Sequence, residues 1–245
     1  MTGKSCIDPS SALMTMLYDI NKNKWSKEIL LLLGIKEEQL PEIITSGKKL
    51  GCLTKSALHL LKLPKETEVF CGGHDQYCAA LGAGVYNPGD VMLSCGTAWA
   101  IVIVTKEPVF DLNSEFAPGP HVLKNTYGLL TAISMGGICL DWIKNIFNIK
   151  KYSEITELIK NVPPGSGGLI FIPPIKGKGT FTGLSINHSS SQILRAVMEG
   201  LGFELKRKLN LAKKMGVKPR SLTMVGGASK NPFWAQIIAD ITGLT

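Results

Sequence analysis

The sequence predicts an α/β fold, because at least three times a short apolar strand ends in glycine and gives way to a helix. The three glycine junctions lie at residues 72–73, 136–137 and 226–227. In α/β proteins, strand ends of this kind converge on one crevice, where ligands bind. The G-x-x-x-x-G-K-S/T and G-x-G-x-x-G fingerprints do not occur in the sequence, so the P-loop fold and the Rossmann dinucleotide fold are excluded.

Length and composition indicate a globular protein that can bury a substantial core, in one large domain or two smaller ones. The chain has 245 residues, of which 44% are hydrophobic and 19% are charged. The longest apolar runs fall short of a membrane span, and no secretory signal pattern opens the sequence. We therefore expect no association with a membrane and a cytoplasmic location.

The net charge of +8 does not by itself predict a nucleic-acid partner. The lysines are scattered and are not interleaved with aromatic residues, as they are on many nucleic-acid surfaces. We expect Lys206, Arg207 and Lys208 on the solvent face of a helix. An anionic small-molecule substrate would also tolerate this positive field, so the charge does not identify a function.

The cysteine pattern predicts buried, reduced thiols rather than a disulfide framework or a zinc site. The six cysteines include no C-x-x-C pair and lie mostly within apolar runs. A hydrolase that uses a cysteine and a histidine is not predicted, because no cysteine lies at a strand-to-helix turn beside an obvious base.

The N-terminal part of the chain predicts three short helices. The first starts near Asp8, and its expected N-cap is Ser10 or Ser11, because a serine hydroxyl can accept from the free amides of a first turn. The second helix is expected to end at Gly34. After a connecting segment, the third helix is broken by Pro64.

The central part of the sequence places a carboxylate at the end of a strand. The apolar run 69–71 predicts a buried strand, which stops at a glycine pair and presents Asp75. Because α/β proteins carry their chemistry at strand ends, Asp75 is a candidate catalytic residue. The alternative from the residues alone is that Asp75 only caps the helix predicted at 76–84.

Two strand-like runs at 91–94 and 99–105 predict a hairpin. Its tip carries Gly96 and Thr97. Such a tip can bring backbone N–H groups and a hydroxyl up to a phosphate. The alternative is that Thr97 serves only the turn.

The second half predicts further strands and helices. In chain order we expect a loop at 108–120, a strand at 126–133, a helix at 136–147, a strand at 168–174, a glycine- and hydroxyl-rich loop at 176–191, a long helix at 192–215, a strand at 221–227 and a last helix opened by Asn231 and Pro232. Serines at the end of the second loop can cap the long helix. Trp142 and Trp234 recur among apolar residues at helical spacing, so we expect both in the core.

Four motifs follow one another between Gly72 and Gly243. They are GGHDQ with the following ALGAG, then SCGTA, then GTFTGLSINHSSSQILRAVME, and finally VGGASKNPFWAQIIADITG. Together they resemble successive motifs of the FGGY family of carbohydrate kinases, with xylulokinase-, glycerol kinase- and fuculokinase-like members. That family belongs to the actin, hexokinase and Hsp70 ATPase superfamily. The segment TGKSCIDPSSALMTMLYDI also resembles the end of the family's first domain.

The resemblance implies a ribonuclease-H-like α/β domain that follows the tail of a like domain. Residues 1–67 are expected to form the tail of the family's N-terminal domain and the crossing between domains. Residues 68–245 are expected to form the C-terminal ATP-binding domain, truncated at its C-terminus. The family's D-x-G-T type turn has no match here, so we expect the chain to be an excised piece of a longer kinase.

The activity implied by the resemblance is ATP-dependent phosphorylation of a sugar or polyol hydroxyl. Asp75 matches the family's catalytic base, and Gln76 resembles a contact to a substrate hydroxyl. The base must lie within reach of the hydroxyl, orient its oxygen in line with the γ-phosphorus and accept its proton. Mg²⁺ is implied together with ATP, because the charge that develops during the transfer must be neutralised.

Five further residues match the family's nucleotide contacts. Thr97 matches the second phosphate-binding turn, and Gly137 with Asp141 matches a pair near the ribose and the phosphates. Some branches of the family carry an amide where this chain has Asp141. Gly227 and Asn231 match the adenosine motif, in which a glycine lets the purine approach and an amide can hydrogen-bond it. For Gly137 and Gly227, close packing of helix on sheet is the competing explanation.

The main alternative function is an actin-like nucleotide-binding switch that has no sugar kinase activity. It would share the glycine turns but would not need GGHD beside a sugar. The two functions differ in whether ADP forms only when a sugar is present. The sequence does not name the sugar, and it leaves the oligomeric state open, including a homo-oligomer.

Overall fold

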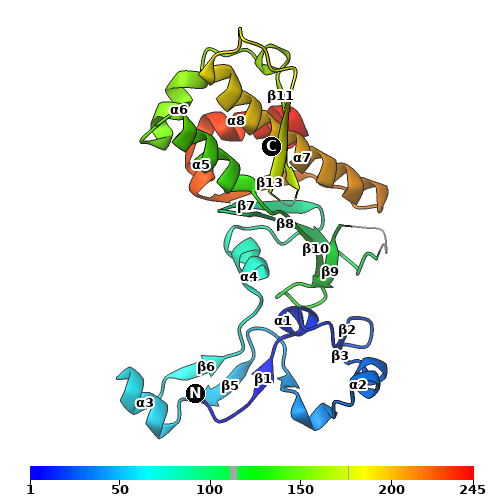
Figure 1. Cartoon of the computed structure of the whole chain (residues 1–245). Coiled ribbons are helices and arrows are strands. Elements are labelled where there is room, and N and C mark those ends of the chain that lie inside the picture. Colours follow the sequence, from blue (N-terminus) through cyan, green and yellow to red (C-terminus); the bar gives the residue numbers. More distant parts are fainter. Residues whose placement is uncertain (111–114, 176) are drawn as a thin grey trace. The chain divides into compact units, whose positions relative to one another are not determined.

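The computed structural model describes residues 1–110, 115–175 and 177–245 (Figure 1). The chain divides into two compact units. The first unit comprises Met1–Pro88, Val104–Val109 and Pro118–Leu129, and the second comprises Gly89–Ile103, Phe110–Ala117 and Leu130–Thr245. The loops predicted at 108–120 and 176–191 each include positions that lie outside the described residues, namely 111–114 and 176.

The first unit is built from short elements that pair locally. Its elements in chain order are β1 (Cys6–Ile7), α1 (Pro9–Leu13), β2 (Tyr18–Asp19), β3 (Lys24–Trp25), α2 (Lys27–Leu33), the 3-10 helix η1 (Glu37–Gln39), β4 (Glu42–Ile43), β5 (Lys49–Cys52), α3 (Lys55–Leu61), β6 (Glu68–Phe70) and α4 (Asp75–Gly82). β1 pairs with β4 in parallel, whereas β2 with β3 and β5 with β6 pair antiparallel. Each pair is a separate two-stranded sheet.

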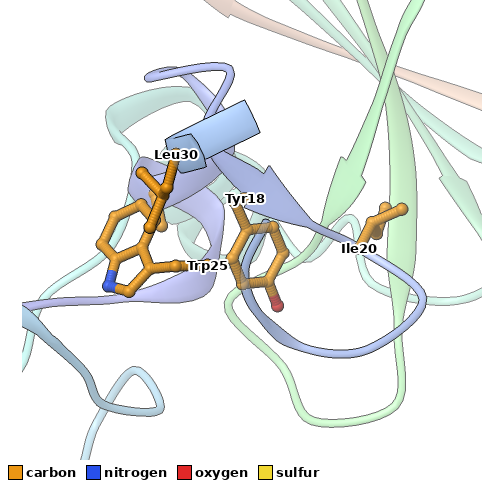
Figure 2. Packing of buried hydrophobic residues seen from close by; sticks show 5 residues of the cluster. Tyr18, Ile20, Trp25 and Leu30 are labelled. Carbon is orange, nitrogen blue, oxygen red and sulfur yellow. The ribbon is translucent and has the colours of Figure 1, made fainter. Parts of the chain in front are cut away.

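A small hydrophobic core orders the N-terminal segment although its elements are short. Ala12, Tyr18, Trp25 and Leu30 are buried in it, and Figure 2 shows Leu30 lying against the Trp25 indole. The indole N–H of Trp25 donates to the carbonyl of Pro41 at 3.0 Å, so the polar atom of this side chain is satisfied as well. Packing, rather than helix propensity, therefore stabilises these short helices.

Helix ends in the first unit follow local capping chemistry. α2 ends at Gly34, which has a left-handed conformation with φ of 67°, and this confirms the prediction. The predicted N-cap of α1 is wrong, because the cap is Asp8, whose carboxylate accepts from the amides of Ser10 and Ser11. α1 is also only 5 residues long, since the chain continues into β2 instead of extending the helix.

The strand that precedes Asp75 is not buried, contrary to the prediction. Phe70 in β6 is 53% exposed. β6 pairs only with β5, in a two-stranded sheet that offers little surface on which a second layer could pack. An apolar run therefore did not ensure burial at this point of the chain.

The second unit contains most of the main sheet and the long helices. The elements from Asp90 onward are, in chain order, β7 (Asp90–Cys95), β8 (Trp99–Thr105), β9 (Ala117–Pro120), β10 (Tyr127–Ile133), α5 (Gly136–Ile146), α6 (Tyr152–Ile159), η2 (Ser166–Gly168), β11 (Ile170–Ile175), β12 (Lys178–Thr182), α7 (Ser190–Lys214), β13 (Ser221–Gly226), η3 (Gly227–Lys230) and α8 (Pro232–Thr242). The chain crosses the boundary between the units within β8, β9 and β10.

The main sheet has the strand order β13, β7, β8, β10, β9. β7 and β8 form the predicted antiparallel hairpin, in which Cys95 pairs with Trp99. β13 is parallel to β7, with Gly226 opposite Cys95. Residues 91–93 and 101–103 are fully buried, so both faces of the hairpin are covered. The hairpin tip and the C-terminal glycine of β13 therefore lie at the same end of the strands.

The long helix α7 lies at the centre of the second unit. It packs against α5, α6, α8 and β11 (Figure 1). Ser189 caps it and accepts from the amide of Gln192, as the serine-rich lead-in predicts. A Cβ added at Gly200 would lie 2.2 Å from the carbonyl oxygen of Phe171, so glycine lets the helix approach β11.

Several elements are not predicted from the sequence. β9 lies within the predicted loop at 108–120. β12 lies within the predicted loop at 176–191 and pairs antiparallel with β11. α6 lies between the predicted helix at 136–147 and the next predicted strand. A separate finding is that no helix among the described residues has both the length and the apolar character that crossing a bilayer requires.

Several predicted side-chain environments are wrong. Cys52 and Cys78 are exposed, whereas the cysteine pattern predicts buried thiols. Trp142 is 46% exposed, and its ring stacks on that of Phe181 in β12 rather than entering the core. Lys208 is buried rather than solvated, because its ammonium group contacts the Glu115 carboxylate and lies 3.2 Å from the hydroxyl of Thr131. Trp234 is buried at 3% exposure, which confirms its predicted place in the core.

Candidate active site

The hairpin tip between β7 and β8 is bonded directly to the start of α5. The Thr97 carbonyl accepts from the amides of Gly137 and Ile138, at 3.0 and 3.3 Å. A Cβ added at Gly137 would lie 2.3 Å from the carbonyl oxygen of Gly96, which is too close for any side chain. Close packing alone therefore requires glycine at position 137.

A cavity of about 280 Å³ lies beside this junction, within the second unit. Its lining residues are Cys95, Gly96, Thr97, Trp99, Gly137, Leu140, Asp141, Tyr152, Gly227, Ala228 and Trp234. We call this cavity the glycine pocket. Four of the five predicted nucleotide residues line it together, namely Thr97, Gly137, Asp141 and Gly227. An exposed threonine beside glycine-rich turns and a helix start is an arrangement that suits a phosphate.

Gly227 differs from Gly137 in what surrounds it. A Cβ added at Gly227 would meet no atom of the described residues within 4 Å, and this glycine does not have a positive φ. Neither packing nor backbone conformation therefore requires glycine here. Because Gly227 also lines the glycine pocket, the absence of a side chain leaves room for a ligand to approach the backbone.

Asp141 lies on the wall of the glycine pocket and is bonded to Tyr152. The Tyr152 hydroxyl donates to Asp141 Oδ1. Burial raises the pKa of Tyr152 to about 12, with a further contribution from this hydrogen bond. Tyr152 therefore remains a donor at neutral pH. Asp141 follows Gly137 by about one helical turn, so both residues lie on the same face of α5.

The fifth predicted nucleotide residue, Asn231, caps α8. Its Oδ1 accepts from the amides of Phe233 and Trp234, at 3.1 and 3.2 Å, and its Nδ2 donates to Thr156 Oγ1 at 2.8 Å. Asn231 is not among the residues that line the glycine pocket. Its side chain holds the start of α8 and connects it to α6, and its adenosine contact stays a prediction.

Trp99 and Trp234 are among the residues of the glycine pocket that sequence reasoning misses. Their ring centroids are 5.3 Å apart. The indole nitrogen of each is buried and has no hydrogen-bond partner among the described residues. A buried N–H donor without a partner costs free energy, so a hydrogen-bond acceptor on a ligand in the pocket would remove this cost. The available signal was the place of Trp99, which directly follows the hairpin tip.

Asp75 belongs to the first unit and is the first residue of α4. Its side chain is 78% exposed, and its Oδ1 lies 3.4 Å from His74 Nδ1. The same oxygen accepts from the amide of Gln76 at 2.7 Å. The exposed carboxylate can meet a substrate. The capping role considered for Asp75 is wrong, because His74 is the N-cap of α4 and Asp75 accepts from the next amide rather than from one two or three residues on. The role of Asp75 as the base stays a prediction.

Gln76 presents an acceptor that lacks a partner. Its Oε1 is buried and has no hydrogen bond with any described residue. Its Nε2 lies 3.4 Å from Asp75 Oδ2, so the amide group is oriented beside the carboxylate. A substrate hydroxyl that donates to Oε1 would remove the cost of the buried acceptor. The predicted substrate contact of Gln76 has this observation in its favour and stays a prediction.

The described side chains do not fit a protein-held magnesium ion. Among them, no group of three or more histidine, cysteine, aspartate or glutamate side chains is placed to hold a metal. In the residues that line the glycine pocket, Asp141 is the one carboxylate, and it is bonded to Tyr152. We therefore assign no magnesium ligand in the described part of the chain.

Comparisons with known proteins match the whole chain to one family. The model of the C-terminal domain of the FGGY family of carbohydrate kinases matches residues 91–245, and the model of the N-terminal domain matches residues 1–82. A xylulose kinase of Lactococcus lactis is 32% identical over 253 residues, which cover 98% of this chain and 50% of that protein. The predicted domain boundary between residues 67 and 68 stays a prediction.

Solved structures show the same similarity. The structure of ligand-bound xylulose kinase from Lactobacillus acidophilus matches with a TM-score of 0.92 at 28% identity, and covers 100% of this chain and 52% of that one. Gluconate kinase from the same organism matches with a TM-score of 0.91, at the same identity and coverage. The chain thus spans about half the length of the relatives it matches, and the ribonuclease-H-like α/β fold is confirmed. These matches show that the chain belongs to the FGGY family of carbohydrate kinases.

Proposed function

We propose that the full-length protein transfers the γ-phosphoryl group of ATP to a hydroxyl of a sugar or polyol. One observation carries the proposal. In a chain of the FGGY family, Thr97, Gly137, Asp141 and Gly227 line the same pocket although they come from three separate parts of the sequence. These residues were predicted as nucleotide contacts from their motifs, independently of any geometry.

In this proposal Asp75 is the general base. The substrate oxygen forms a bond to the γ-phosphorus while the bond from that phosphorus to the bridging oxygen of ADP breaks. The hydroxyl proton passes to the Asp75 carboxylate. Because an ordinary carboxylate is a weak base toward an alcohol, the proton moves late, and positioning supplies much of the rate. The buried Gln76 acceptor would hold a neighbouring hydroxyl of the substrate.

The nucleotide is proposed to occupy the glycine pocket. The hydroxyl of Thr97 and the backbone of the tip would contact phosphates, and Gly227 would let the adenosine approach the chain. Asp141 would lie near the ribose, and Asn231 near the purine. Mg²⁺ would arrive with ATP, and no described side chain is assigned to it.

The proposed substrates form a class rather than a single sugar. The relatives named above are xylulose kinases and a gluconate kinase, which supports a small, polyhydroxylated substrate for this chain. The cytoplasm, where such substrates are expected to be phosphorylated, is the proposed location.

The test is ADP release from ATP and Mg²⁺ by the full-length protein, across a panel of pentuloses, hexuloses, aldonates and polyols. We expect one compound to raise ADP release and to be phosphorylated itself, as followed by ³¹P NMR. If ATP binds but no compound stimulates turnover, the kinase proposal gives way to the nucleotide-binding switch.

A further inference from the structure

Residues 72–74 form the loop that leads into Asp75, and hydrogen bonds fix the backbone at the N-terminal end of this loop. The amide of Cys71 donates to the carbonyl of Lys48 at 2.9 Å, and its own carbonyl accepts from the amide of Gly47 at 2.8 Å. Beyond the loop, the amide of Cys78 donates to the carbonyl of His74 at 2.9 Å, which closes the first turn of α4. The position of Asp75 therefore depends on how residues 72–74 are held between these two points.

A side chain from α1 binds the last residue of this loop. The amide of His74, directly before Asp75, donates to Ser10 Oγ at 2.9 Å. Ser10 is fully buried, and the two residues are 64 positions apart in the sequence. This is a long-range bond from a side chain to the backbone, and it attaches the loop to the start of α1.

Asp8 determines that the Ser10 hydroxyl acts as a hydrogen-bond acceptor toward His74. The Ser10 hydroxyl donates to Asp8 Oδ2, which also accepts from the amide of Ser10 at 2.8 Å and from Ser46 Oγ at 3.1 Å. A hydroxyl has a single proton, so once that proton is given to Asp8, Ser10 Oγ is left as an acceptor for His74. Asp8 is only 3% exposed, which shields this arrangement from water.

The same loop packs closely against the segment that contains Val122. A Cβ added at Gly73 would lie 2.3 Å from Val122 Cγ1 and 3.5 Å from Ser10 Oγ. A Cβ added at Gly72 would meet no atom within 4 Å in the part of the chain that the structure describes. The loop is thus tight at Gly73, next to the Ser10 contact, and open one residue earlier.

We propose that Ser10, oriented by Asp8, is a positioning residue that fixes the backbone of His74 and thereby places the Asp75 carboxylate for proton transfer. The inference rests on the proposed kinase function for its catalytic consequence. The hydrogen-bond chain from Asp8 through Ser10 to His74 is an observation in its own right. Ser10 touches neither the sugar nor ATP in this proposal, so its effect is on the turnover step.

The test compares Ser10→Ala with Ser11→Ala in the full-length protein. Both substitutions remove a serine hydroxyl from α1, but the structure gives Ser11 a contact to Asp8 through its backbone amide, which alanine retains. In Ser10→Ala we expect kcat to fall about 10- to 100-fold, as for a small displacement of a catalytic group, with KM for ATP within about twofold of the parent value. Ser11→Ala should behave like the parent enzyme.

Amide hydrogen exchange gives a readout that does not depend on turnover. The His74 amide should exchange roughly tenfold faster in Ser10→Ala than in the parent protein and be unchanged in Ser11→Ala. Asp8→Asn is a second variant, because asparagine still caps α1 but no longer offers two acceptor oxygens. It should reproduce the loss of kcat seen in Ser10→Ala.

Faster exchange at His74 together with a fall in kcat supports the proposal. Unchanged kcat in Ser10→Ala overturns it, and so does an equal loss in Ser11→Ala, which would indicate general damage to α1. A fall in kcat without faster exchange at His74 also overturns it. If the parent protein has no sugar-dependent turnover, the kinase function fails instead, and exchange at His74 alone then decides whether Ser10 holds the loop.

Discussion

The two units hold their proposed functional residues in different ways. In the second unit the glycine pocket lies at the tip of the hairpin of β7 and β8, whose central residues are fully buried, and backbone bonds join this tip to α5. In the first unit Asp75 is the exposed first residue of α4, and the strands that precede it form two-stranded sheets. Leu31, Leu32 and Leu60 of this unit are at least 80% exposed. The core thus shapes the pocket, whereas a few hydrogen bonds, one of them to Ser10, fix the backbone that precedes Asp75. Substitutions in the pocket should act on packing and affinity, and those at Asp75 on chemistry.

The largest expected effect is that of Asp75→Asn on turnover. Removal of a general base lowers kcat by about 100- to 10,000-fold, and because Asp75 lies in the first unit, the Kd of ATP should stay within about twofold of the parent value. Steady-state kinetics and calorimetric ATP titration of the full-length protein measure the two quantities. Asp19→Asn is the control, because Asp19 is a carboxylate of the same unit that accepts from the amides of Asn21 and Lys22. Turnover by Asp75→Asn close to that of the control would show that Asp75 is not the general base.

Acid should destabilise the two units at different pH values. Burial lowers the pKa of His121, in the first unit, from its ordinary 6.5 to about 4. The unfolded chain therefore takes up the proton first, and stability that is full above pH 6.5 is lost as the pH falls toward 4, by on the order of 3 kcal/mol. In the second unit, Arg207 and then Lys208 lower the pKa of Glu115 from 4.5 to about 2, so that this carboxylate loses its contribution only in stronger acid.

Urea unfolding at pH 7.5 and pH 5, followed by amide exchange in each unit, measures this difference. The first unit should weaken over this interval and the second should not. His121→Gln should remove most of the pH dependence of the first unit, since glutamine does not titrate. Parallel losses of stability in both units would contradict the assignment to His121.

The smallest expected effects separate two glycines of the same pocket. Gly137→Ala forces its Cβ against the Gly96 carbonyl, so we expect it to lower the free energy of unfolding by about 1–3 kcal/mol and to weaken ATP binding as well. Gly227→Ala has open space, so stability should be unchanged while the Kd of ATP rises roughly tenfold, equivalent to about 1.4 kcal/mol. Thermal unfolding and calorimetric titration provide both numbers. If Gly227→Ala binds ATP as tightly as the parent protein, the adenosine does not approach this residue.

Elements with a local signal could be predicted from the sequence. Gly34 ends a helix by adopting a left-handed conformation, and Ser189 and Asn231 begin helices by accepting from first-turn amides. The pocket residues Thr97 and Gly227 follow from the same kind of signal, since each lies where a strand ends. Short-range rules were sufficient there because the interactions they describe are themselves short-range.

Features that depend on distant partners could not be predicted in this way. Lys208 is buried because Glu115, 93 positions earlier, provides the opposite charge. The role of Ser10 in helix capping was predicted wrongly, since its hydroxyl is bonded to Asp8 and accepts from His74. No local pattern distinguishes these side chains from ordinary surface or capping residues.

The bond between the hairpin tip and α5 has a consequence for directed evolution of this protein. Because the Thr97 carbonyl accepts from two amides of α5, the three residues that connect β7 to β8 have to keep their number. An inserted residue would move that carbonyl, and the two amides in the first turn of α5 would lose their hydrogen-bond acceptor. Libraries that test the proposed nucleotide contact of Thr97 should therefore vary the side chain at position 97 and leave the length of the turn unaltered.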